Sequence, residues 1–160
     1  MTRRDFSNIS PSEILSILNV GNALDCSLMC EQIGERDWYG YARRWLLKRQ
    51  IRPMMGRKCA LFAFQMAGRH DVEDVEMYEH IVRTDRSLVL VDEALSALTL
   101  CGVRERTELL RRIAANSNRT PEMIARIREA IRCLNLGVGL YEDDGLVDEH
   151  GVWPLTQARQ

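Results

Sequence analysis

Basic and aromatic side chains are concentrated in residues 38–58 of this 160-residue chain, and they form its densest set of groups suited to binding. On a helix, which advances about 100° per residue, the apolar Ala42 and Leu46 of this stretch share one side. An adjacent arc mixes cations with aromatic rings. We predict that this arc binds a partner through Tyr41, Arg44, Trp45, Lys48 and Arg52.

Cations beside aromatic rings suit two kinds of partner. Aromatic and arginine side chains are the anchors that carry most of the energy of protein interfaces. The same groups bind nucleic acids, because bases stack on the rings and phosphates pair with the cations. We predict a protein partner, with nucleic-acid binding by segment 38–58 as the alternative. A third interpretation is a solvated face whose Trp45 packs under a neighbouring helix pair.

No other group of side chains in the sequence provides a complete set of metal ligands. Cys26 and Cys30 lie four residues apart on one helix face, but no second Cys or His pair is near them in the sequence. Glu76 and His80 share this spacing, again without further ligands. The acidic residues of 143–150 lack the ordered spacing of a calcium loop. We predict no metal, no cofactor and five reduced thiols: Cys26, Cys30, Cys59, Cys101 and Cys133.

Signatures of catalysis are missing from the sequence. It contains no glycine-rich phosphate loop, no nucleophile elbow and no zinc-protease helix. Histidine is the side chain that most often serves as a base near neutral pH, and the sequence contains only three: His70, His80 and His150. We therefore predict a non-catalytic protein with no catalytic residues, and we keep an enzyme with an unrecognised site as a further alternative.

Composition favours packing of helix on helix. Apolar residues make up 46% of the chain but aromatic residues only 6%, so the core must consist mainly of aliphatic side chains. No run of about 18 apolar residues is present, and the N-terminus lacks the apolar stretch of a secretory signal. We expect a cytoplasmic protein, of bacterial type, that does not enter a membrane.

Charge is divided unevenly along the chain. Residues 1–70 carry 11 Lys/Arg and 6 Asp/Glu, whereas residues 71–160 carry 11 Lys/Arg and 17 Asp/Glu.

Start and stop signals divide the chain into about eight helices. Ser10, Asn22 and Thr120 are suitable N-caps, and Gly21, Gly68 and Gly137 follow apolar helical patterns as C-terminal stops. We expect the basic and aromatic stretch to belong to a helix over 35–50, which ends before Pro53. Residues 139–160 are acidic and rich in turn residues.

An internal repeat relates three of these helices. Segments 58–68, 92–102 and 128–138 start 34 and 36 residues apart and place small and large apolar residues in the same order. A period of this length is typical of stacked helical pairs. Their small residues, Ala63, Ala97 and Cys133, would let neighbouring helices approach closely.

The third copy, with Ile127-Arg128 before spaced small and apolar residues and a closing Gly137, resembles the second helix of a HEAT repeat. The earlier copies carry Lys58 and Asp92 in place of the arginine. In another phase, 68–72 together with Val75, Tyr78 and Ile81 is similar to tetratricopeptide-type repeats. Both resemblances imply an α-solenoid. Three unrelated amphipathic helices in a bundle are the alternative.

These observations predict an all-α protein: a short α-solenoid, or stack of helical-hairpin repeats, over 1–138, followed by an acidic, irregular segment over 139–160. Helical stacks present extended surfaces for binding. We therefore predict a protein-binding module, such as an adaptor, a secretion chaperone or an immunity protein that neutralises a toxin.

Overall fold

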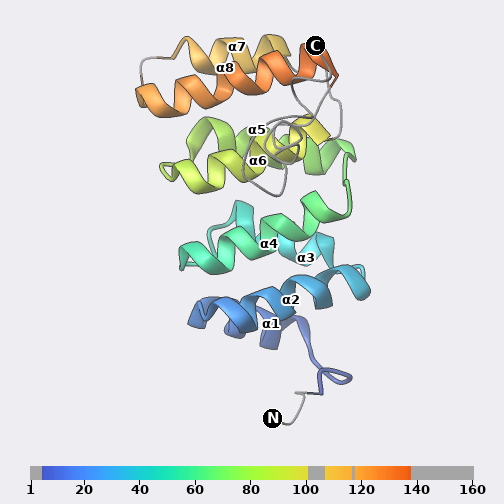
Figure 1. Cartoon of the computed structure of the whole chain (residues 1–160). Helices are drawn as coiled ribbons and strands as arrows, with labels where there is room; N and C mark the ends of the chain where they lie inside the picture. The colour runs from blue at the N-terminus through green and yellow to red at the C-terminus, as the bar shows by residue number, and fades with distance from the viewer. Residues whose placement is uncertain (1–4, 101–106, 117, 138–160) are drawn as a thin grey trace, which may run out of the picture. The chain divides into compact units, whose positions relative to one another are not determined.

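The computed structural model describes residues 5–100, 107–116 and 118–137 (Figure 1). All regular secondary structure in these ranges is α-helical, which confirms the predicted all-α class and helix number. The eight helices are α1 (Pro11–Val20), α2 (Ala23–Glu35), α3 (Tyr39–Leu47), α4 (Met54–Met66), α5 (Val72–Thr84), α6 (Leu88–Leu100), α7 (Thr107–Ala114) and α8 (Pro121–Leu136). The acidic segment 139–160 lies outside the described residues.

Local capping signals place several helix ends. Ser10 accepts a hydrogen bond from the Glu13 amide, and the Glu13 side chain accepts one from the Ser10 amide, so the two residues form a capping box at α1. Asn22 caps α2 and Thr120 caps α8 through their side chains. Gly137 ends α8 in the left-handed conformation.

The helix predicted over 35–50 is shorter in the structure. Asp37 adopts a left-handed φ of 55°, and the Trp38 amide donates to the Ile33 carbonyl, so α2 ends and the chain turns before α3. Arg49 repeats the arrangement after α3, with a φ of 54° and a bond from the Gln50 amide to the Trp45 carbonyl. Neither turn contains glycine, the residue that usually marks such a stop.

The chain divides into two compact units, Met1–Arg69 and His70–Gln160. In the first unit, α1 pairs with α2 and α3 with α4, while α2 packs along α4. The core between these helices includes Ile14, Leu18, Ile33, Leu61 and Phe64. Helices α1 and α4 come so close that a Cβ atom on Gly56 would lie 2.2 Å from the Leu18 carbonyl oxygen.

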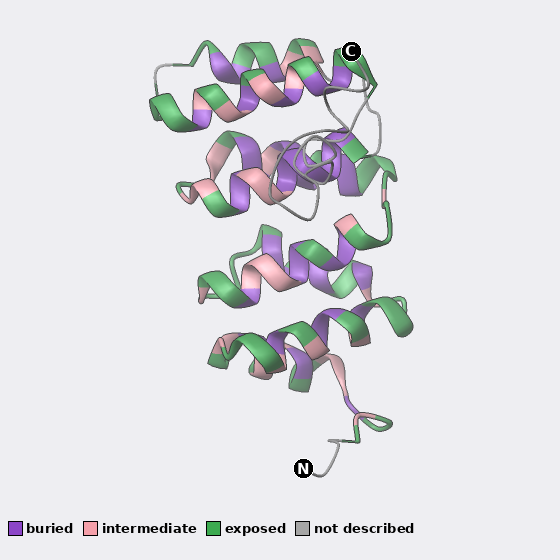
Figure 2. Ribbon diagram, viewed as in Figure 1, coloured by how far each residue is buried: buried purple, intermediate pink, exposed green. Residues whose placement is uncertain are grey.

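The second unit is built from the pairs α5 with α6 and α7 with α8, and α6 packs on α8. Its buried side chains include Tyr78, Leu90, Leu95, Leu98 and Ile127. An ion pair of 2.6 Å between Arg126 Nε and Asp92 Oδ1 joins α8 to α6. Buried residues in both units gather on the faces that the helices turn toward one another (Figure 2).

The three repeat segments begin within α4, α6 and α8, the second helix of three successive pairs. The small residues at the matched position, Ala63, Ala97 and Cys133, are all buried. A larger side chain at this position has no space to occupy in a densely packed core.

Ala97→Leu therefore lowers the free energy of unfolding by about 1–3 kcal/mol through overpacking. Ala125→Leu, at an exposed position of α8, is the matched control and has little effect. Urea unfolding followed by circular dichroism measures both variants. Equal stability of the two variants would show that the matched position is not closely packed.

Candidate interaction surface on helix α3

Helix α3 separates a buried face from a basic one. Tyr39, Ala42 and Leu46 form the buried face, inside the first unit. Arg44 and Lys48 are exposed, as is Arg52 in the loop that follows, and Tyr41 is 44% exposed. Four of the five predicted binding residues are therefore accessible on the first unit.

Trp45 does not share this exposure. Only 5% of its surface is accessible, although the helical arc placed it with the exposed cations. It lies beside the buried face of α3, and its ring contacts the exposed Tyr41 ring with ring centroids 6.2 Å apart and an interplanar angle of 32°. Trp45, which we predicted as a binding residue, is therefore part of the core, and Tyr41 is the accessible ring.

The aromatic contacts continue toward the start of α3. The Trp38 and Tyr41 rings meet edge to face, 6.1 Å apart, and the Arg36 guanidinium lies 5.2 Å from the centroid of the Trp38 ring. Offset and edge-to-face contacts of this kind add to the packing energy of the rings. Tyr41 therefore contacts the rings of both Trp38 and Trp45.

The segment that contains Tyr41 is rich in cations. Residues 38–70 contain eight Lys/Arg and no Asp/Glu. Among the described residues, the side chains of Arg44, Lys48 and Arg52 form no ion pair. Cations without a carboxylate partner favour an anionic binding partner. This acid-free run is the signal in the sequence that points most directly to the surface.

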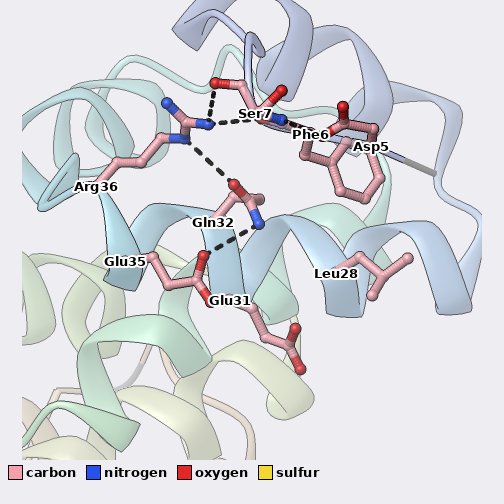
Figure 3. Close-up of a pocket in the computed structure, with 8 residues that line it drawn as sticks. All are labelled: Asp5, Phe6, Ser7, Leu28, Glu31, Gln32, Glu35 and Arg36. Atoms are coloured by element: carbon pink, nitrogen blue, oxygen red, sulfur yellow. Dashed lines mark hydrogen bonds between the residues drawn. The ribbon is translucent and has the colours of Figure 1, made fainter. Parts of the chain in front are cut away.

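A pocket of about 490 Å³ lies along the C-terminal half of α2 (Figure 3). Arg36 forms one side of it and donates to the backbone carbonyls of Phe6 and Ser7 and to the Gln32 side chain. The guanidinium thus fastens the N-terminal segment to α2. The other lining side chains include the carboxylates Asp5, Glu31 and Glu35. The role we assign to Arg36 here is structural.

Two cysteines of the first unit, Cys26 and Cys30, are buried in its core. Burial, followed by the neighbouring Cys59 and Glu31, raises the pKa of the Cys30 thiol to about 12. Burial also raises the pKa of Cys26. Both thiols are therefore protonated at neutral pH and are poor metal ligands or nucleophiles. The described residues hold no group of three or more side chains arranged for a metal ion.

The remaining candidates have separate outcomes. Glu76 is exposed and His80 is half-buried on α5. The acidic residues 143–150 and Cys101 lie outside the described part of the chain. No helix among the described residues has the length and apolar character needed to cross a bilayer.

Comparison with known proteins identified no relative. No family model matches the chain, and no curated protein or solved structure is detectably similar to it. The resemblance to HEAT and tetratricopeptide-type repeats therefore stays a prediction from the internal repeat. The function has to be inferred from the surface itself.

Proposed function

We propose that the protein is a non-catalytic binding module whose α3 surface contacts an acidic region of another protein. The observation that carries the proposal is the half-exposed Tyr41 ring, in contact with two tryptophan rings, together with the exposed side chains of Arg44, Lys48 and Arg52, which form no ion pair among the described residues. An aromatic anchor within a complementary charged rim is the usual composition of an interface hot spot. Roles that fit are an adaptor, a secretion chaperone or a toxin-neutralising immunity protein in a bacterial-type cytoplasm.

The internal repeat supports a module built for binding. Buried small residues recur at one position of α4, α6 and α8, each in the second helix of a pair. Repeated pairs of this kind form α-solenoids, which present helix faces as extended binding surfaces. The proposal thus includes a HEAT-like or tetratricopeptide-like stack as the scaffold.

Tyr41→Ala and Arg44→Glu test the proposal. Each lowers partner affinity by about 2 kcal/mol, or about 30-fold, because an anchor or a complementary charge is lost. Proteins captured by the wild type but not by Arg44→Glu are identified by mass spectrometry, and titration calorimetry with the purified partner measures the loss. Arg83→Glu, an exposed charge reversal on α5, is the control that keeps affinity.

Thermal stability separates binding from folding in this experiment. Tyr41 and Arg44 are exposed, so both variants melt close to the wild-type temperature. Partner affinity that is unchanged in both variants contradicts the proposal.

Nucleic acid is the alternative that the acid-free run of eight cations also favours. In that case the wild type binds generic DNA or RNA at physiological salt. The affinity then falls steeply with salt, because bound phosphates release counterions. Charge reversal at Arg44, Lys48 and Arg52 removes this salt dependence, and such a result would replace the protein partner by nucleic acid.

A further inference from the structure

One end of the first unit is formed by two connections that lie against each other, the α1–α2 turn and the α3–α4 loop. The Asn19 side chain donates to the Gln50 carbonyl and accepts from the Arg52 amide, both at 3.0 Å. A Cβ atom on Gly21 would lie 3.0 Å from Cβ of Pro53. We call this region, residues 19–24 and 47–54, the tip.

Apolar side chains are unusually exposed at the tip. Val20 is 77% exposed and Leu24 64%, and Leu47 and Met54 across the contact are 40% and 37% exposed. Val20 follows Leu18 but lies off the face that Ile14 and Leu18 bury, so the fold of the unit does not cover it. Exposed aliphatic side chains on connections that contact each other favour an interaction site at the tip.

Three cations accompany these apolar groups. Lys48, Arg49 and Arg52 are exposed in the α3–α4 loop. Among the described residues their side chains form no ion pair. The tip therefore carries both exposed apolar side chains and exposed cations.

The backbone of the tip is held in one conformation. Asn19 bonds the loop at two backbone atoms, Gly21 has a φ of 77°, and Arg49 has a φ of 54° that non-glycine residues rarely adopt. A surface fixed before binding loses less conformational entropy when a partner docks. Arg49 in this conformation places a cation in the loop where a glycine would be easier to accommodate.

We propose that the tip docks an acidic amphipathic helix of the partner protein, with the apolar face of that helix on Val20 and Leu24 and its carboxylates near Arg49 and Arg52. This inference rests on the proposed function, because the tip includes Lys48 and Arg52 of the same basic surface. Amphipathic helices bind apolar surfaces through side chains at spacings of three, four and seven residues. Charge complementarity selects an acidic helix.

The apolar groups favour a protein over a nucleic acid. A nucleic-acid backbone pairs with the cations but leaves Val20 and Leu24 without an apolar counterpart. Membrane-binding helices place tryptophan, phenylalanine or leucine on an apolar face beside cations. The tip contains leucines but no tryptophan or phenylalanine, so a vesicle is included in the experiment as a competing partner.

A synthetic 18-residue helix with leucines at three-, four- and seven-residue spacings and glutamates elsewhere is a suitable probe. Fluorescence anisotropy with the full-length protein at physiological salt measures its affinity. We expect saturable binding at micromolar concentration, and no binding of the same helix with lysine in place of glutamate. Replacing the leucines by alanine weakens binding about tenfold or more, because the apolar contact is lost.

Variants locate the probe on the protein. Val20→Ser with Leu24→Ser weakens binding about tenfold or more, and so does Arg52→Glu alone. Val72→Ser, at a 66% exposed valine of α5, and Arg86→Glu, in the exposed α5–α6 turn, are matched controls that keep the wild-type affinity. The substituted side chains are exposed in the tip variants and in the controls, and melting temperatures confirm that each variant is folded.

Unchanged binding in the Val20→Ser, Leu24→Ser variant overturns the inference, as does equal binding of the alanine helix. An 18-base-pair DNA duplex or phosphatidylserine-containing vesicles that bind the tip more tightly than the peptide also overturn it. The two proposals fail in different ways. If Arg44→Glu loses partner capture but the tip variants change binding of neither the probe nor the partner, only the docking site at the tip is contradicted. If Tyr41→Ala and Arg44→Glu both keep partner capture, the α3 surface is contradicted.

Discussion

Trp45→Ala lowers the free energy of unfolding of the first unit by about 3–5 kcal/mol. The indole is only 5% exposed and supports the Tyr41 ring from beneath, so its removal leaves a cavity and takes away an aromatic contact. Urea unfolding followed by circular dichroism measures the loss. Trp45→Phe, which keeps an aromatic ring at the site, costs less than Trp45→Ala.

Tyr41→Ala is the matched comparison, because Tyr41 belongs to the same aromatic contact but is 44% exposed. It changes stability far less than Trp45→Ala and acts mainly on partner affinity. If Trp45→Ala keeps the wild-type stability and loses only affinity, the tryptophan is a surface anchor and its buried position in the structure is wrong.

Gly56→Ala destabilises the first unit through overpacking by about 3 kcal/mol, the upper end of the usual range. The new Cβ atom would lie 2.2 Å from the Leu18 carbonyl oxygen and 2.8 Å from Cγ2 of Ile51. Because the nearest atom belongs to the backbone of α1, the two helices must move apart, and overpacking of this kind is costly. Chemical denaturation of the purified variant measures the effect.

Gly40→Ala is the control for the backbone. Gly40 lies in α3, and a methyl group added there would meet no atom of a neighbouring element within 4 Å. Alanine there stabilises the helix by about 0.5–1 kcal/mol, because glycine loses more backbone entropy on folding. If the Gly56→Ala variant is as stable as the Gly40→Ala variant, α1 and α4 do not approach closely.

The α3 surface and the tip have different consequences for the partner. At the α3 surface an aromatic ring and cations meet the acidic region, so its variants change both affinity and salt dependence. At the tip the apolar contact matters as well, so serine at Val20 and Leu24 weakens binding without altering charge. A partner that engages both regions shows losses from both sets of variants, although coupled sites need not give additive losses.

The sequence by itself determined the features that depend on neighbours along the chain. The all-α class follows from helical periodicity, and the caps at Ser10, Asn22 and Thr120 follow from side chains that reach amides three residues away. The cationic character of segment 38–70 is equally local, because it contains eight Lys/Arg and no Asp/Glu.

Tertiary structure alone decided which of those residues are accessible. A helical arc gives the direction of Trp45 and Tyr41 but not where the neighbouring helices stop covering them, so it could not separate the buried indole from the exposed phenol. The turns at Asp37 and Arg49 depend on left-handed conformations without a glycine to announce them. The tip required a contact between residues about 30 positions apart, Asn19 with Gln50 and Arg52, and packing at that separation has no signature in local sequence.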